Sequence, residues 1–224
     1  QSLHFKQLFD SIKFFEFNNL HHEHISYGTL NDSDGNPFKT RDGGTKPLSE
    51  LFEETYEYIK NINSDLEDST IKQLANSVLT FSDLITNRKT DYKFDLEKFT
   101  NVNGKTGIYV QYAQVRAKRL QQSISQQKNE MESLILSDVD KQLLSQLFMF
   151  GYFLEQSSSL NEPHHLANYL YDISNSFNQF YEHEKLSEIK DINHLSSKLY
   201  LINLFLTTSE NVMFCLGMKP VDKM

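Results

Sequence analysis

Apolar residues recur at helical spacing along most of the chain after Pro47, and this pattern constrains the fold more than any other feature. Leu48, Leu51 and Phe52 fall on one face of a helix, and similar spacing returns in the later segments. Each such helix must bury its apolar stripe against another element. With 224 residues the chain is long enough to bury a sizeable core. We therefore predict a mainly α protein that ends in a helical bundle.

The expected helices cover residues 3–15, 47–63, 71–85, 108–124, 137–156, 161–184 and 191–218. Residues 64–69 are polar and predict a turn, whereas residues 86–104 lack helical periodicity. Gly217 and Pro220 are expected to stop the last helix. Tyr169, Tyr171, Phe177 and Phe180 are expected in the core.

Composition narrows the class of protein. No apolar run approaches the roughly 20 residues that a membrane span needs, and the first residues lack the pattern of a secretory signal. The single cysteine, Cys215, lies in an apolar run, so we expect it to be buried; it has no partner for an internal disulfide. We expect a monomeric cytoplasmic protein that does not bind a membrane.

One stretch reverses the sign of the charge. The whole chain has a net charge of −8, yet residues 98–128 contain six basic residues and no Asp or Glu. Gly104 and Gly107 flank Thr106 within this stretch, and Thr106 is a plausible helix cap. A basic helix is therefore expected to begin near Ile108.

Two faces of this basic helix differ in chemistry. Tyr109, Tyr112, Arg116 and Arg119 share one face, beside an apolar stripe that begins with Val110. Tyrosine rings can stack on unpaired bases while guanidinium groups hold phosphates, so the face suits single-stranded nucleic acid. Composition alone leaves open a simpler interpretation, a buried tyrosine pair beside an ordinary solvated basic face.

A glycine-rich loop offers a second candidate site. Residues 28–44 contain four glycines together with Lys39 and Arg41. Glycines let backbone amides approach a phosphate closely, and the two cations can add charge to the same concavity. A plain surface loop is the alternative interpretation.

Four ordered blocks carry a resemblance to a known family. The run GKTGIYVQYAQVR resembles the GNTGPYLQYAHAR-type segment that opens the anticodon-binding domain of arginyl-tRNA synthetases. The block TNRKTDYKFD before this run, and the blocks EPHHLANYLYDISNSFNQFYEHE and LGMKPVDKM after it, are similar to characteristic segments of that family. The segments occur in the same order in both. The resemblance implies the C-terminal half of such an enzyme. Residues 1–95 would be the end of its class I catalytic domain, a partial α/β remnant, and residues 96–224 an all-helical anticodon-binding domain.

The resemblance also implies roles on the catalytic side. The loop DGNPFKTRDGGT resembles the family's DGKPFKTRSGGT variant of the Lys-Met-Ser-Lys-Ser segment, which implies that Lys39 and Arg41 stabilise ATP during adenylate formation. Asn36 and Asp42 depart from that pattern, so some positive charge is missing. The roles implied for the remaining residues are adenine contacts for His24, Tyr27 and Gly28, and an arginine contact for Gln1.

For the helical domain, the resemblance implies binding of tRNA(Arg). The residues it places beside the anticodon are Tyr109, Tyr112, Arg116, Tyr181 and Met224. The complete enzyme would use arginine and ATP, with Mg²⁺. The His-x-Gly-His segment of class I sites occurs nowhere in this sequence, so we expect no aminoacylation by this chain alone. The alternatives are a free-standing tRNA-binding module or partner subunit without catalysis, and a helical scaffold for protein contacts.

Other candidate chemistry is weaker. His21, His22 and His24 surround Glu23, but neighbours on an extended segment point to opposite sides, so at most two could bind one ion. The pair His164 and His165, like the run 182–184, lacks members at i, i+3 or i+4 and is interpreted as solvated helix faces. We expect no bound metal in this chain.

Overall fold

The computed structural model describes all of residues 1–224 except 17–19, 32–46, 94, 125–132 and 184. The fold is mainly helical, as predicted, with one short pair of parallel strands. None of the helices in the described ranges is long and apolar enough to cross a bilayer. The elements in chain order are α1 (Ser2–Phe14), β1 (Leu30–Asn31), α2 (Leu48–Ile62), α3 (Asp68–Leu84), β2 (Tyr92–Lys93), α4 (Leu96–Phe99), α5 (Gly107–Ile124), α6 (Asp138–Leu147), α7 (Phe150–Leu160), α8 (His164–His183), the 3₁₀ helix η3 (Leu186–Glu188) and α9 (Ile192–Cys215).

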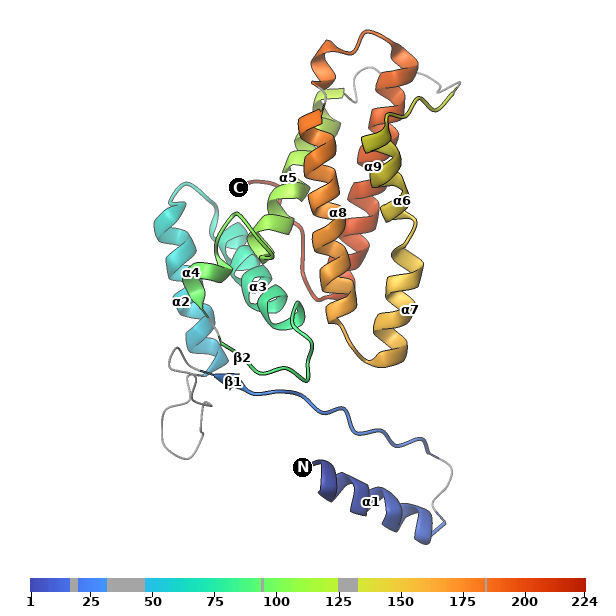
Figure 1. Ribbon diagram of the computed structural model, residues 1–224. Coiled ribbons are helices and arrows are strands. Elements are labelled where there is room, and N and C mark those ends of the chain that lie inside the picture. Colours follow the sequence, from blue (N-terminus) through green and yellow to red (C-terminus); the bar gives the residue numbers. More distant parts are fainter. Residues whose placement is uncertain (17–19, 32–46, 94, 125–132, 184) are drawn as a thin grey trace.

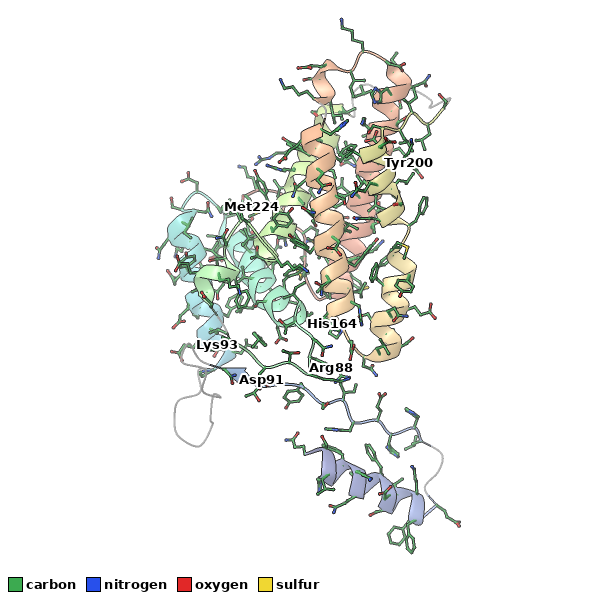
Figure 2. The ribbon with its side chains drawn as sticks, viewed as in Figure 1. Arg88, Asp91, Lys93, His164, Tyr200 and Met224 are labelled. Carbon is green, nitrogen blue, oxygen red and sulfur yellow. The ribbon has the colours of Figure 1, made fainter. Side chains whose placement is uncertain are left out.

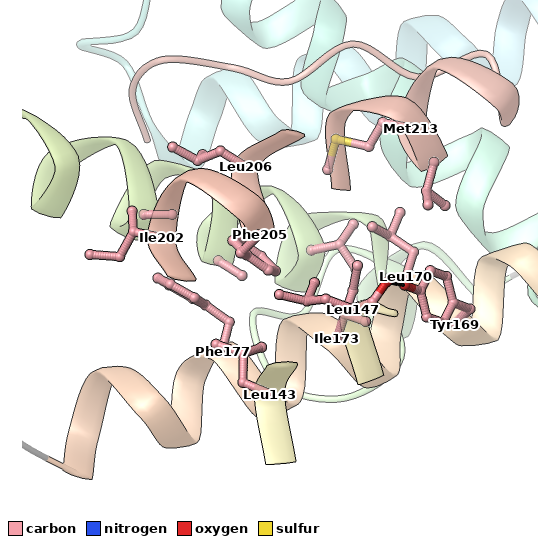
Figure 3. Packing of buried hydrophobic residues seen from close by; sticks show 14 of the residues in the cluster. Leu143, Leu147, Tyr169, Leu170, Ile173, Phe177, Ile202, Phe205, Leu206 and Met213 are labelled. Atoms are coloured by element: carbon pink, nitrogen blue, oxygen red, sulfur yellow. Dashed lines mark hydrogen bonds between the residues drawn. The ribbon is translucent and has the colours of Figure 1, made fainter. Parts of the chain in front are cut away.

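Helix α5 is the element on which the others are assembled. It packs against α3 on one side and against α8 and α9 on the other, and α6 and α7 complete the bundle beyond α8 (Figure 1). Figure 3 shows the interior between α6, α8 and α9, where Phe177 and Phe205 stack with centroids 4.2 Å apart. A second, smaller cluster lies between α2, α3 and α5. Because α5 faces both clusters, its apolar stripe is broader than the sequence suggested.

Gly107 permits the close approach of α5 to α3. A β-carbon at this position would lie 2.2 Å from the carbonyl oxygen of Ser77. One turn further along α5, the buried amide of Gln111 donates to Ser77 Oγ at 2.8 Å and to the carbonyl of Lys219 at 2.7 Å. Its oxygen accepts from the amide of Val221 at 3.0 Å. The C-terminal tail is therefore held along α5, and the C-terminus lies beside this helix in Figure 1.

The expected single helix over 137–156 is wrong: the chain forms α6 and α7, separated by Phe148 and Met149. The buried hydroxyl of Tyr169 contacts the carbonyls of Gln146 and Leu147, each at 3.1 Å. In a continuous helix those carbonyls would accept from amides four residues later. A contact from α8, distant in sequence, thus stabilises the break.

Two smaller expectations also need correction. Cys215 is exposed instead of buried, because the last turn of α9 directs Val212 and Met213 inward. The stretch 86–104 contains the short helix α4, which Asp95 caps by accepting from the amide of Lys98 at 3.0 Å. The stop at Gly217 is confirmed: this residue has φ of +73°, and Met218 N donates to Met213 O at 2.8 Å.

Candidate functional site

The start of α5 is built as the sequence predicts. Thr106 Oγ1 accepts from the amide of Tyr109 at 3.1 Å and donates to the carbonyl of Asn101 at 2.6 Å. Gly104 has φ of +99°, a conformation that favours glycine, and lets the chain turn into the helix. The cap fixes the first turn of α5, and with it the position of Tyr109.

A hollow of about 220 Å³ lies between α5 and α8. Tyr109, Tyr112 and Arg116 line it from α5, as three of the predicted site residues. The other lining residues are Val102, Asn103, Asn175, Asn178, Gln179 and Glu182. Rings, amides and one guanidinium therefore meet in a single concave surface.

Arg116 is the centre of this surface. Its guanidinium carbon lies 4.3 Å from the ring centroid of Tyr112 and 4.7 Å from that of Tyr181, so two aromatic rings contact one cation. The same group donates to Asn178 Oδ1 at 3.0 Å and to the Tyr112 hydroxyl at 3.1 Å. These contacts restrict the side chain to one position. Glu182, which is largely exposed, lies 3.6 Å away and offsets part of the positive charge.

Tyr109 is held by α8. Its hydroxyl donates to Asn175 Oδ1 at 3.2 Å, and its ring lies 5.3 Å from that of Tyr171. Lys105 Nζ lies 5.2 Å from the Tyr171 ring centroid, and burial raises the pKa of the Tyr171 hydroxyl. Tyr109 and Tyr112 are half-buried, and 38% of Tyr181 is exposed. These three rings are thus fixed by neighbours without being sealed in the core.

The basic charge of this stretch is less concentrated than the sequence suggested. Lys118 lies on the other side of α5 and pairs with Asp222 at 2.6 Å. Lys105 donates to Asn168 Oδ1 at 2.8 Å, and Lys128 lies outside the described residues. Among the described residues that line the hollow, Arg116 is the only cation.

Met224 lies apart from the hollow. Its side chain is half-buried against the smaller apolar cluster, and its carbonyl accepts from Arg119 at 3.4 Å. Tyr181 borders a neighbouring groove of about 480 Å³ between the ends of α5 and α8. The structure therefore brings Tyr109, Tyr112, Arg116 and Tyr181 together and places Met224 behind them.

The residues predicted for the ATP side lie in a different part of the molecule (Figure 1). The His24 ring stacks on Phe5 of α1 at 4.5 Å, Tyr27 is 78% exposed, and Gln1 is exposed at the start of α1. The amide of Gly28 donates to the carbonyl of Arg88 at 2.5 Å. Lys39 and Arg41 lie outside the described residues.

Asn175 and Asn178 were missed by sequence reasoning. They follow one another at i, i+3 on α8, and Glu182 continues the same face at the next turn. This spacing was visible in the sequence. What it could not show is that α8 packs alongside α5, which makes the amides into partners of Tyr109 and Arg116.

A second group of polar residues lies at the start of α8. Potential metal-ligating atoms of Glu162, His164 and His165 lie within 4.8 Å of one another. Lys89 Nζ lies 3.2 Å from the carboxylate of Glu162 and holds its pKa below the usual value. Burial, with the charges of His165 and Arg88, lowers the pKa of His164. Two permanent cations beside the group oppose a bound cation, so we assign these residues to a contact between chain segments.

The expectation of solvated faces is accordingly half right. Glu182 and His183 are exposed, and Glu184 lies outside the described residues, whereas His164 and His165 are half-buried with their rings 4.1 Å apart. Glu162, in the turn between α7 and α8, lies 3.4 Å from His165, a contact that the sequence pattern alone does not show.

Comparison with known families identifies the chain. Residues 110–224 match the DALR anticodon binding domain, and residues 1–96 match the catalytic domain of class I (R) tRNA synthetases. The chain belongs to the arginyl-tRNA synthetase family. The resemblance found in the sequence is thereby confirmed.

Curated relatives in this family are longer than the chain. An arginine–tRNA ligase of Francisella tularensis subsp. novicida is 37% identical over 202 residues, which cover 85% of this chain and 35% of the relative. One of Alcanivorax borkumensis is 33% identical and is matched over 100% of this chain and 40% of its own length. The chain thus spans well under half the length of these synthetases.

Solved arginyl-tRNA synthetases share the fold. The Thermus thermophilus enzyme superposes with a TM-score of 0.78 at 21% identity, over 90% of this chain and 35% of its own. The Plasmodium falciparum enzyme gives 0.74 at 24% identity, over 99% of this chain and 39% of its own. At these identities the comparison supports the helical architecture.

Proposed function

We propose that the hollow between α5 and α8, with Tyr181 at its edge, binds unpaired anticodon bases of tRNA(Arg). The observation that carries this proposal is the pair of rings, Tyr112 and Tyr181, on the guanidinium of Arg116. Bases of single-stranded RNA stack on aromatic rings and guanidinium planes, and their edges hydrogen-bond to side-chain amides. The match to the DALR anticodon binding domain supports the same assignment.

Each residue has a distinct role in this proposal. Tyr112 and Tyr181 offer ring faces, Arg116 offers charge and a planar donor fork, and Tyr109 forms the wall nearest Asn175. Met224 packs against the smaller apolar cluster, on the side of α5 away from the hollow. It would therefore contact RNA only outside the hollow, at the C-terminal tail. Because the side chains are already held by hydrogen bonds, little conformational freedom is lost on binding.

The proposal extends to the synthetase reaction. Residues 1–95 would contribute the end of the catalytic domain and residues 96–224 the anticodon-binding domain, in line with the two family matches. Lys39 and Arg41 would stabilise the charge of ATP, a substrate that enters with Mg²⁺. His24, Tyr27 and Gly28 would flank the adenine, and Gln1 would meet arginine. The complete reaction joins arginine to tRNA(Arg) through an arginyl-adenylate.

RNA binding is tested by titrating the chain with tRNA(Arg) and with the same tRNA carrying a substituted anticodon, at two salt concentrations. We expect Tyr181→Leu to weaken tRNA(Arg) binding by about 5- to 150-fold, which corresponds to the loss of stacking on one base. Tyr200→Leu is the matched control, because Tyr200 is 43% exposed on α9, a helix that contributes none of the lining residues given for the hollow (Figure 2). Equal affinity for both tRNAs, or equal effects of both variants, would contradict the proposal.

Catalysis is tested separately. Since the His-x-Gly-His segment is absent from this sequence, the chain alone should not catalyse arginine-dependent exchange of pyrophosphate into ATP. Turnover well above background in that assay would refute this expectation. Tight tRNA binding without exchange is also what the alternative function, a tRNA-binding module or partner subunit, requires. Restoration of exchange by an added fragment that carries the missing segment would distinguish the synthetase from the module.

A further inference from the structure

Arg88 lies where three parts of the chain meet. It follows α3, and its side chain extends between the segment 20–31 and the turn that joins α7 to α8 (Figure 2). Its Nε donates to the carbonyl of Asn161 at 2.8 Å, and its Nη1 donates to the carbonyl of Ser26. One half-buried guanidinium therefore joins two backbone segments that are far apart in sequence.

The backbone of the same residue strengthens the contact. The carbonyl of Arg88 accepts from Gly28 N at 2.5 Å, and a β-carbon on Gly28 would lie 2.6 Å from the carbonyl oxygen of Thr90. Thr29 N donates to Asp91 Oδ1 at 2.6 Å, beside the parallel pairing of β1 with β2. The segment 26–31 is thus attached to the link 86–93 along its whole length.

The bundle side of the contact is also polar. Lys89 pairs with Glu162 at 3.2 Å, and Asn161 Nδ2 donates to Glu23 Oε2 at 3.2 Å. Each of these polar contacts has at least one exposed partner, so each contributes little to stability by itself. Arg88 differs because two of its guanidinium N–H groups donate to backbone carbonyls in a partly buried position.

We infer that Arg88 is a positioning residue, which fixes the segment 26–28 on the α7–α8 turn of the helical domain. Tyr27 lies between Ser26 and Gly28, the two residues that Arg88 binds, so its placement follows from this contact. The helix α8 begins at the same turn and ends at the hollow. This one helix therefore sets the position of the segment 26–28 relative to the hollow. The importance of this contact for catalysis rests on the proposed function, which puts Tyr27 beside adenine. The existence of the contact does not depend on that function.

Lysine cannot replace this arginine. The guanidinium has donors that point in two fixed directions, whereas an ammonium on a flexible stem cannot serve two separated carbonyls with the same geometry. Arg88→Ala and Arg88→Lys should therefore release the segment 26–28 alike, although the second keeps the charge. A purely electrostatic role would instead be rescued by lysine.

The test measures distance in the whole chain without RNA. Spin labels are placed at His21→Cys and Glu155→Cys, both exposed positions, with Cys215→Ser removing the native exposed thiol. The parent should give one narrow distance distribution, and both Arg88 variants a clearly broader one. Arg119→Ala is the matched arginine control and should retain the narrow distribution, since Arg119 contacts the chain end. A narrow, unshifted distribution in Arg88→Ala would overturn the inference.

Hydrogen exchange provides a second measurement. Amides of Gly28 and Thr29 should exchange at least about tenfold faster in the Arg88 variants, while those of α8 stay protected. If Arg88→Ala loses its helical circular-dichroism signal, Arg88→Lys decides by the same two measurements, and parent-like values in it would refute the inference. Binding of tRNA(Arg) should be unchanged in Arg88→Lys. If the parent chain does not bind tRNA(Arg), the proposed function is refuted, but the distance measurement still tests the role of Arg88.

Discussion

At the scale of single residues, Gly107 decides how closely α5 approaches α3. We predict that Gly107→Ala lowers the free energy of unfolding by about 1–3 kcal/mol, because the new β-carbon would meet the Ser77 carbonyl and force the helices apart. The measurement is urea unfolding followed by circular dichroism. Gly151→Ala is the matched control: nothing lies within 4 Å of its β-carbon, so it should raise stability by about 0.5–1 kcal/mol. Effects of the same sign at both positions would contradict this account.

Individual side chains also show what a sequence can and cannot reveal about the site. Tyr109, Tyr112 and Arg116 could be grouped from one helix, because their spacing depends only on helical geometry. Asn178 could not be assigned to Arg116, since their contact depends on how two helices distant in sequence pack. The same limit applies to Lys118, which counted toward the basic stretch but pairs with Asp222 on another side.

At the scale of elements, a buried ion pair joins α6 to α9. Lys198 Nζ lies 2.7 Å from a carboxylate oxygen of Asp140, and each side chain is only 1% exposed. Asp140 also forms a capping box with Ser137 at the start of α6. We predict that Lys198→Met costs about 3–5 kcal/mol of unfolding free energy, because it leaves a buried carboxylate without its cation.

The control for this pair is Lys141→Met, which removes the exposed Lys141–Asp138 contact on the same helix and should barely move the urea midpoint. The double variant Asp140→Asn with Lys198→Met should be less damaging than the sum of its single changes, since neither charge is then left alone. Additive losses would show that packing, and not the ion pair, holds α6 on α9.

Most helices were predictable from local pattern, and the exception is instructive. The α2 and α3 boundaries follow from apolar spacing and polar flanks, which are local properties. The break between α6 and α7 was not predicted, because Tyr169 engages the carbonyls of Gln146 and Leu147 from another helix. Helical periodicity continues through Phe148, and only tertiary contact interrupts it.

At the scale of the whole molecule, the net charge of −8 opposes binding to RNA, so local charges must favour it. Glu182 is the carboxylate at the hollow, 3.6 Å from Arg116 and largely exposed. We predict that Glu182→Gln strengthens binding of tRNA(Arg) by about two- to fivefold at low salt, because it removes repulsion of phosphate and frees part of the Arg116 charge. The gain should shrink as added salt screens the charges.

Local and global charge are separated by a matched variant. Glu155→Gln changes the net charge by the same amount, but Glu155 is exposed on α7, a helix that contributes none of the lining residues given for the hollow. If position matters, only Glu182→Gln should change both the affinity and its dependence on salt concentration. Equal gains in the two variants would mean that RNA responds to the total charge of the molecule. That result would contradict the proposal that the anticodon binds in the hollow between α5 and α8.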